Sequence, residues 1–418
     1  MPASTLLYRV DSRARQTSKS DRAKDNAFSL LAGMALMPTE LHRGLEGVLV
    51  AESELSHIDG DEGRLVYRGY DIEDLARGAS YEEVLFLLWN GTLPTADELE
   101  TFSETLAGHR DVHECVLTAM EALADGDEEP MAALRTGISM LSVSDTGLDA
   151  DSARLEAARH QGGEIVAKIP TVLAAFQRLR ENKRPVEPDP ELGYAANFLY
   201  MLTGTRPDSV SIESFDEALT LHTDHGLNAS TFTAMVIGST MADVYSAVTG
   251  AIGALSGSLH GGANQDVMEF LRRIRDSGRD PVEWVTEYRD AGNRVPGFGH
   301  RVYNVTDPRA GILQERLEAI VENGGDDTWL EYTSAIRGSL EQEGLSEEGI
   351  APNVDFYSGA VYDHLGIPDD LYTPIFAMAR AGGWIAHTLE YQADNRLIRP
   401  RAKYTGDSPV PFTPLEER

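Results

Sequence analysis

The chain has 418 residues, of which 42% are hydrophobic and 25% charged, an ordinary globular balance. Its 68 acidic residues against 36 basic ones give a formal net charge of -32, which would repel nucleic acid and anionic membranes. No apolar run approaches the roughly eighteen residues of a membrane span. The single cysteine, Cys115, excludes an intramolecular disulfide and a cysteine-based metal cluster, and favours a reducing cytoplasm.

The basic residues are almost all arginines. Lysine occurs at only five positions: Lys19, Lys24, Lys168, Lys183 and Lys403. An acidic, lysine-poor surface on a foldable chain is typical of a protein that works in concentrated salt, where screening weakens the repulsion between like charges. The composition therefore predicts a halophilic protein.

The N-terminal part of the chain divides into an extension and a small sheet. Residues 1–38 are basic and rich in serine and arginine, and we interpret them as a loosely ordered extension, with Met37 as a candidate natural start. Residues 45–71 predict two or three short strands joined by a turn at 59–63. The acids of that turn do not form a calcium loop, because the twelfth loop position is Tyr70 and not glutamate.

After Tyr70 the pattern is helical nearly to the end of the chain. Apolar residues recur at three-to-four spacing and each run stops at a glycine or a charged turn. Residues 181–193, with three prolines and many charges, predict an exposed loop. There is no fixed-period repeat and no Rossmann or P-loop fingerprint, so we predict an all-α fold with a small N-terminal sheet. The predicted helical segments are 72–78, 81–91, 96–109, 113–126, 163–182, 190–204 and 214–226.

Two histidine-bearing stretches stand out in the middle of the chain. In LHTDHGLNAST, His222 and His225 lie three apart, a spacing that places them on one helix face. This pair lacks the third ligand of a recognisable zinc motif, so we predict no metal site. In GALSGSLHGGANQ, His260 lies just before an expected helix start at Gln265. There the helix dipole would keep the imidazole neutral, as a donor suited to an enolate oxygen.

Two later stretches complete the set of reactive groups. VPGFGHRV presents His300 on a glycine turn, and Asp307 and Pro308 should begin a helix that carries Arg309 in its first turn. Asp355 lies between apolar neighbours, which would raise its pKa and suit it to act as a general base. Together these groups fit removal of a proton next to a carbonyl, with arginines holding an anionic partner and no metal or redox cofactor required.

The chain resembles the citrate synthase family, in particular its shorter archaeal and Gram-positive-like branch. Six motifs occur in family order between about Leu41 and Gly406: HTDHGLNAST, GSLHGGAN, VPGFGHRV with DPR, PNVDFYSG, MARAGGWIAH and LIRPRAKYTG. The resemblance implies a homodimer of almost wholly helical subunits, and the single cysteine favours a cytoplasmic location. Each subunit would have a large domain, 39–258 with 367–418, and a small domain, 259–366, that closes over substrate.

The resemblance also implies the reaction, the condensation of acetyl-CoA with oxaloacetate to give citrate and free CoA. Asp355 would remove a methyl proton of acetyl-CoA while His260 stabilises the enol. His300 would polarise the oxaloacetate carbonyl. No cofactor is bound permanently, since the CoA thioester is a co-substrate.

Binding residues follow by the same resemblance. We assign substrate binding to His225, Asn228, Arg309, Arg380 and Arg399, the last reaching into the partner's site. The assigned CoA contacts are Val295, Gly297, Phe298, Gly299 and Arg301. The family's basic residue near Asn304 or Val305, which meets a CoA phosphate, is missing here.

Three alternatives stay open at the level of sequence. A 2-methylcitrate synthase would use propionyl-CoA in the same fold. A metal-dependent hydrolase would use His222, Asp224 and His225. A noncatalytic helical dimer scaffold would need none of these groups.

The charge imbalance generates the first prediction. Lowering the salt concentration from about 1 M or more to about 0.1 M lengthens the screening distance from about 3 to about 10 Å, so acidic side chains repel more strongly. We expect the protein to lose helical circular dichroism in low salt and to unfold at a lower temperature. A fold and melting temperature unchanged by salt would contradict the halophilic interpretation.

Overall fold

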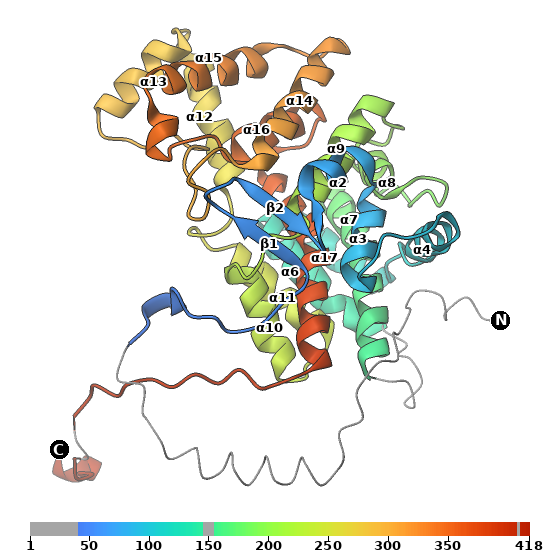
Figure 1. The fold of residues 1–418 in the computed structure, drawn as a ribbon. Helices are drawn as coiled ribbons and strands as arrows, with labels where there is room; N and C mark the ends of the chain where they lie inside the picture. The colour runs from blue at the N-terminus through green and yellow to red at the C-terminus, as the bar shows by residue number, and fades with distance from the viewer. Residues whose placement is uncertain (1–40, 145–153, 408–409) are drawn as a thin grey trace. The chain divides into compact units, whose positions relative to one another are not determined.

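The computed structural model describes residues 41–144, 154–407 and 410–418, so the predicted extension at 1–38 lies outside the described residues (Figure 1). The described residues fall into two compact units, 53–396 and a smaller unit made of 41–52 and 397–418. The smaller unit holds two short 3-10 helices, η2 (Arg43–Leu45) and η6 (Leu415–Glu417). The larger unit contains all the other elements.

The predicted N-terminal sheet is confirmed. Strands β1 (Ser56–Asp59), β2 (Arg64–Tyr67) and β3 (Tyr70–Asp71) pair antiparallel in that order. The turn between β1 and β2 is stabilised from within, because Oδ1 of Asp59 accepts the main-chain N–H groups of Asp61 at 3.0 Å and Glu62 at 2.9 Å. This carboxylate therefore acts as a turn cap.

The predicted helical fold is also confirmed, with sixteen α-helices in the part of the chain that the structure describes. Two of these helices begin at capping boxes, formed by Ser80 with Glu83 and by Thr95 with Glu98. Short 3-10 helices are η3 (Ser142–Ser144), η4 (Leu345–Glu348) and η5 (Asp369–Leu371). The α-helices are α2 (Ile72–Gly78), α3 (Tyr81–Asn90), α4 (Ala96–Gly108), α5 (Glu114–Asp125), α6 (Pro130–Leu141), α7 (Arg154–Arg180), α8 (Tyr194–Thr203), α9 (Ser209–His222), α10 (Ala229–Ser239), α11 (Val244–Leu255), α12 (Ala263–Ser277), α13 (Pro281–Asp290), α14 (Pro308–Glu322), α15 (Thr328–Gln342), α16 (Asp355–His364) and α17 (Tyr372–Ala393).

Two predicted segments differ from the structure. Helix α7 is one helix of 27 residues with Pro170 inside it, and it begins before the predicted segment, whose polar start hid the boundary. Helix α9 ends at His222, and His225 lies beyond it in a turn with Gly226 at φ +60°. The prediction that the two histidines share a helix face is therefore wrong. The exposed loop expected at 181–193 is present between α7 and α8.

Helix α17 runs through the centre of the larger unit (Figure 1). It packs against α7, α9, α10 and α11, and its residues from Tyr372 to Leu389 are nearly all buried. Close packing at its middle depends on Gly383, where a Cβ atom would overlap the carbonyl oxygen of Thr223. The C-terminal end of α9 is therefore held directly against α17.

Helices α12 to α16 gather together in the upper part of Figure 1. Helix α16 packs against α12 and α14, and α13 packs against α15. Helix α14 also contacts α9 and α2. These contacts bring the loops before α14 and α16 close to the C-terminal end of α9.

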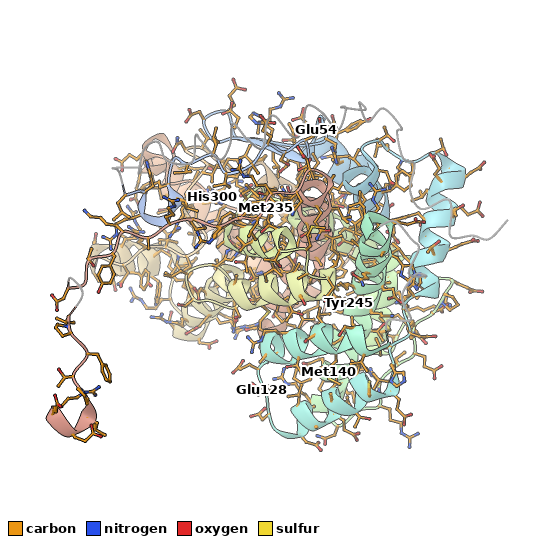
Figure 2. All side chains as sticks on the ribbon, turned by 90° about the horizontal axis from the view of Figure 1, so that it is seen from below. Glu54, Glu128, Met140, Met235, Tyr245 and His300 are labelled. Atoms are coloured by element: carbon orange, nitrogen blue, oxygen red, sulfur yellow. The ribbon has the colours of Figure 1, made fainter. Side chains whose placement is uncertain are left out.

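A buried polar network links α7 to α11 inside the helical core. The hydroxyl of Tyr245, labelled in Figure 2, donates to Glu164 at 2.7 Å, and the same carboxylate pairs with Lys168 at 2.9 Å. Pairing of this kind offsets the cost of removing charge from water. Among the described residues no helix combines the length and the apolar character needed to cross a membrane.

The packing at Gly383 generates the second prediction. Gly383→Ala should lower the free energy of unfolding by about 1–3 kcal/mol, because the methyl group meets main-chain atoms that cannot rotate away. Gly311→Ala is the matched control, since Gly311 is exposed in α14 and an added Cβ there would have nothing within 4 Å. This control should raise stability by about 0.4–1 kcal/mol. Denaturant unfolding in high salt measures both, and equal stabilities for the two variants would contradict the packing argument.

Candidate active site

Main-chain hydrogen bonds fasten the loop that carries His300 to the segment that precedes Asp355. The Gly299 N–H donates to the carbonyl of Ala351 at 2.8 Å, and the Asn353 N–H donates to the carbonyl of Gly297 at 2.9 Å. The side-chain amide of Asn353 adds a bond to the carbonyl of Gly299 at 2.9 Å. Two loops that are distant in sequence therefore form one rigid wall.

Gly297 explains why this loop needs glycine. Its φ is +80°, a conformation that L side chains rarely adopt, and a Cβ atom would lie 2.9 Å from the Cα of Phe356. The neighbouring Phe298 packs edge-on against Phe356 with ring centroids 4.7 Å apart. The loop can thus lie directly on the start of α16, where Asp355 is the first residue.

His300 is held in one neutral tautomer. Its Nδ1 faces the main-chain N–H groups of Val302 at 3.0 Å and Tyr303 at 3.2 Å. Because an N–H group can only donate, Nδ1 is the acceptor and the ring proton lies on Nε2. Burial lowers the pKa of His300, and the positive charge of Arg309 lowers it further. His300 is therefore a neutral ring with an Nε2–H donor.

His225 lies beside His300. The two ring centroids are 5.4 Å apart, and both rings contact Tyr303. The Nε2 atom of His225 lies 3.2 Å from the Tyr303 hydroxyl. Burial lowers the pKa of His225 well below its usual value, and Arg309 and Arg380 act in the same direction. Tyr303 thus connects two histidines that come from different loops.

His260 is oriented by the opposite ring nitrogen. Its Nε2 faces the main-chain N–H of Ser230 at 3.2 Å and the Ser230 hydroxyl at 2.9 Å. The hydroxyl also accepts the indole N–H of Trp384 at 3.1 Å. With Nε2 as acceptor, the proton lies on Nδ1, which becomes the donor.

The predicted neutrality of His260 agrees with its lowered pKa. His260 precedes α12 with Gly261 and Gly262 between them. Burial lowers its pKa first and the charge of Arg380 second. Burial of the ring is therefore the largest cause of its neutral form.

Asp355 has the predicted environment. Burial raises its pKa from 3.8 to about 6, although Arg309 and Arg380 oppose the rise. Among the described residues no group donates a hydrogen bond to its carboxylate. The main-chain N–H of Asp355 donates to Asn353 Oδ1 at 3.0 Å. A poorly solvated carboxylate without hydrogen-bond donors is a stronger base than an exposed one.

Arg309 and Asp307 form a buried ion pair. Asp307 caps α14, as predicted, and its two carboxylate oxygens accept from Nε of Arg309 at 3.0 Å and from Nη2 at 2.8 Å. Burial alone would lower the pKa of Arg309, but the Asp307 charge raises it above the usual value. The same carboxylate accepts the N–H of Val354 at 3.3 Å, so the pair also supports the segment before Asp355.

Arg380 is the second buried guanidinium, and its surroundings are different. Its Nε donates to the carbonyl of His222 at 2.6 Å, and its guanidinium lies 4.6 Å from the centroid of the Phe376 ring. Within the described part of the chain no carboxylate forms an ion pair with it. Burial lowers its pKa to about 10, with Asp224 acting against the shift. A buried cation without a counter-ion is a site for an anion.

The remaining assigned residues have varied surroundings. The Asn228 side chain caps α10, accepting from the N–H groups of Ser230 and Thr231 at 3.1 Å each. Val295 is buried, whereas Arg301 is exposed next to His300. Arg399 belongs to the smaller unit and is not among the residues that 53–396 brings together.

The residues of the metal-hydrolase alternative are engaged in other contacts. Nδ1 of His222 lies 2.6 Å from the carbonyl of Ala218, and Asp224 Oδ1 lies 3.1 Å from Nε2 of His387. Burial would raise the pKa of Asp224, yet His387 holds it below its usual value. No cluster of three or more metal-binding side chains occurs among the described residues.

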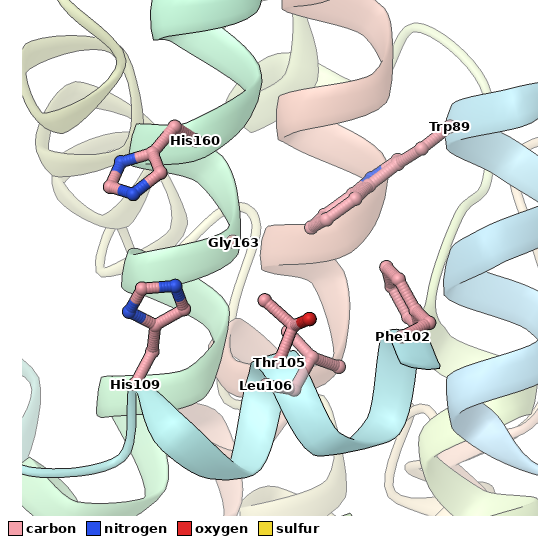
Figure 3. Close-up of a pocket in the computed structure, with 7 residues that line it drawn as sticks. All are labelled: Trp89, Phe102, Thr105, Leu106, His109, His160 and Gly163. Carbon is pink, nitrogen blue, oxygen red and sulfur yellow. The ribbon is translucent and has the colours of Figure 1, made fainter. Parts of the chain in front are cut away.

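A separate pocket lies between α3, α4 and α7 (Figure 3). His109 and His160 face each other on one side of it, and Trp89 and Phe102 lie on the other. Thr105, Leu106 and Gly163 complete its lining. Its walls hold none of the residues assigned to catalysis or binding.

The grouped residues define a class of chemistry. A desolvated carboxylate, two neutral imidazoles with defined donors and two buried guanidiniums are suited to enol formation next to a bound anion. The comparisons with known proteins agree with this class. A family model described as citrate synthase, C-terminal domain, matches residues 44–401. The chain belongs to the citrate synthase family and is an acyltransferase.

Individual relatives cover nearly the whole chain. The citrate synthase of Haloferax volcanii is 60% identical over 383 residues, 91% of this chain and 100% of that protein. The crystal structure of citrate synthase from Pyrobaculum aerophilum has a TM-score of 0.82 at 38% identity, covering 92% of this chain and 97% of that one. Citrate synthase from Thermoplasma acidophilum, in a ternary complex with carboxymethyl coenzyme A and oxaloacetate, has a TM-score of 0.81 at 32% identity, covering 91% and 100%. Two relatives from Corynebacterium glutamicum named 2-methylcitrate synthase are 37% and 36% identical.

Sequence reasoning missed the residues that orient the reactive groups. Tyr303, Trp384 and His387 lie within or next to the six motifs, but nothing in their spacing indicates that they contact His225, Ser230 and Asp224. The signal that could have found Trp384 is its indole N–H, which needs a partner when buried. The contacts of Tyr303 and His387 leave no comparable signal in the sequence.

The pKa of Asp355 generates the third prediction. Its folded-state pKa of about 6 exceeds the unfolded value of 3.8, so the folded protein favours the protonated carboxyl group. The stability that Asp355 contributes in this protonated form is complete below about pH 3.8 and is lost as the pH rises through about 6. Asp355→Asn, which stays neutral, should therefore raise the free energy of unfolding by about 1–3 kcal/mol near pH 8 and by little near pH 4. Urea unfolding at the two pH values measures the difference. A gain of the same size at both would contradict the assignment.

Proposed function

We propose that the protein condenses acetyl-CoA with oxaloacetate and water to give citrate and CoA, the first reaction of the tricarboxylic acid cycle. The observation that carries the proposal is the pair of neutral histidines with opposite tautomers, His260 donating from Nδ1 and His300 from Nε2. One donor is needed for each of two carbonyl oxygens. Asp355 supplies the base that the same reaction requires.

The reaction proceeds in three steps. Asp355 removes a proton from the methyl group of the thioester, while Nδ1–H of His260 hydrogen-bonds the thioester oxygen and stabilises the enolate. The enolate carbon attacks the keto carbon of oxaloacetate, and Nε2–H of His300 passes its proton to the oxygen that becomes the citrate hydroxyl. Water then hydrolyses the citryl thioester, which releases citrate and the CoA thiol; the proton freed from the new carboxyl group returns to His300, and Asp355 gives its proton to water.

Oxaloacetate binding is supported by the guanidinium groups. Arg380 has no carboxylate partner among the described residues, and it meets one carboxylate of the dianion. Arg309 keeps Nη1 for substrate while Asp307 holds Nε and Nη2. His225 adds a contact beside His300, and Asn228 shapes the same loop. Forked guanidinium groups bind carboxylates better than lysine does.

The CoA thioester is a co-substrate, and no permanently bound cofactor takes part. The main chain of Val295, Gly297, Phe298 and Gly299 lines its path, with Arg301 as the exposed cation beside it. The family's basic residue is missing near Asn304 or Val305, and the side-chain amide of Asn304 donates to Asp61 Oδ1 at 2.7 Å.

The assembly belongs to the same proposal. Residues 259–366 form a small domain and the rest of 39–418 a large one, supported by the grouping of α12 to α16. The chain forms a cytoplasmic homodimer in which Arg399 reaches the partner's site. The charge of -32 and the 60% identity to a Haloferax volcanii protein support a halophilic enzyme.

The fourth prediction distinguishes acetyl-CoA from propionyl-CoA as the substrate by comparing their rates. A single methylene changes transition-state binding by about 1–3 kcal/mol, so kcat/KM should be about 10- to 200-fold higher for acetyl-CoA than for propionyl-CoA. Thiol release with oxaloacetate in high salt measures both. A higher kcat/KM for propionyl-CoA would assign the chain to 2-methylcitrate synthesis instead.

The same assay tests the catalytic base. Asp355→Ala should lower kcat by about 100- to 10,000-fold, the usual contribution of general base catalysis. Asp276→Ala, which removes an exposed carboxylate from α12, is the control and should keep full activity. Equal turnover by the two variants would contradict Asp355 as the base, and no thiol release by the parent protein would favour the noncatalytic scaffold.

A further inference from the structure

The β1–β2 hairpin is anchored at its open end to the residue that precedes His225. Ser56 and Tyr67 lie directly opposite each other in the two strands. The Ser56 hydroxyl donates to the Asp224 carboxylate at 2.5 Å. The Tyr67 hydroxyl donates to the carbonyl of Asp224 at 2.7 Å and accepts from its N–H at 3.1 Å. Three hydrogen bonds therefore fix the chain at Asp224 to the sheet.

The turn of the same hairpin contacts the segment that follows His300. The carbonyl of Gly60 accepts the N–H of Asn304 at 2.9 Å, and Asp61 Oδ1 accepts the Asn304 side-chain amide at 2.7 Å. A Cβ atom at Gly60 would overlap the carbonyl oxygen of Val302. The turn and residues 302–304 are therefore packed main chain against main chain.

Both anchored segments control a histidine directly. Residues 302 and 303 supply the two N–H groups that hold Nδ1 of His300, so their position sets the tautomer and the direction of the ring. His225 follows Asp224 immediately, and both rings contact Tyr303. One hairpin thus contacts the loop of His225 at its open end and the loop of His300 at its turn.

We propose that the β1–β2 hairpin sets the relative placement of His225 and His300, with Gly60 and Asp61 as positioning residues for the reaction. This inference rests on the proposed function, because it assigns the spacing a role in how oxaloacetate meets the Nε2–H of His300. The hairpin touches no substrate, and it acts through the loops that it joins. A contact that served stability alone would affect folding and leave turnover per folded molecule unchanged.

The exposure of the turn makes the two roles separable. Asp61 and Asn304 are both exposed, so their hydrogen bond contributes little to the stability of the whole unit. Small displacements of a proton donor nevertheless reduce catalysis strongly. Loss of this bond should therefore change turnover more than unfolding.

The test compares variants at both ends of this bond with a matched control on the same turn. Asp61→Ala and Asn304→Ala should each lower kcat with acetyl-CoA and oxaloacetate by about five- to tenfold, the equivalent of one hydrogen bond, with little change in KM for acetyl-CoA. The double variant should fall no further, because each change removes the same contact. Glu62→Ala removes an equal charge from the neighbouring position and should retain the parent kcat. Asp61→Asn keeps the acceptor oxygen and should restore it.

Gly60→Ala provides a stronger perturbation and an independent readout. NMR of ¹⁵N-labelled histidine in the full-length protein should show the Nδ1 and Nε2 signals of His300 shifted in Gly60→Ala and Asp61→Ala, and unchanged in Glu62→Ala. Parent values of kcat and of the His300 signals in Asp61→Ala and Gly60→Ala would overturn the proposal. If the parent protein makes no citrate, the proposed function fails, and the NMR shifts still decide whether the hairpin positions His300.

Discussion

The site depends on the hydrogen bonds that join residues 297–299 to residues 351–353. Without them, His300 and Asp355 would lie on two separate loops with no fixed distance between them. Gly297 makes this contact feasible, because any side chain there would collide with the main chain of Phe356. A backbone interaction, and not a contact between reactive side chains, therefore sets the geometry of the proposed condensation.

Charge is distributed unevenly between the surface and the site. The chain carries a large excess of acid, yet two guanidinium groups are buried within reach of Asp355. Asp307 neutralises Arg309, whereas Arg380 donates to a carbonyl, lies over an aromatic ring and forms no ion pair among the described residues. Under the proposed function, an anion in the site meets Arg380 and Nη1 of Arg309 at short range, while salt screens the distant negative charges. The proposed binding therefore depends on these local charges, in a protein whose overall charge would oppose it.

Much of the fold was predictable because it follows from local signals. Capping residues and helical periodicity indicate most of the helices, the turn at 59–63 indicates the hairpin, and Asp307 with Pro308 indicates the start of α14. At the candidate site, the raised pKa of Asp355 was predictable from its apolar neighbours. The end of α9 at His222 was not, since the first glycine that could stop the helix comes only at Gly226. Nor were the histidine tautomers, because they depend on main-chain N–H groups that the fold brings into place.

Three side chains on one face of α17 form hydrogen bonds with three different segments of the chain. Arg380, Trp384 and His387 lie on one helical face, and they contact the carbonyl of His222, the hydroxyl of Ser230 and the carboxylate of Asp224. A rotation or slide of this single helix would displace the buried guanidinium of Arg380, the support of His260 and the anchor of the hairpin in the same direction. The three contacts therefore depend on the position of one helix. A substitution that shifts α17 should disturb all three, and a second substitution that restores only one of them should not restore the site.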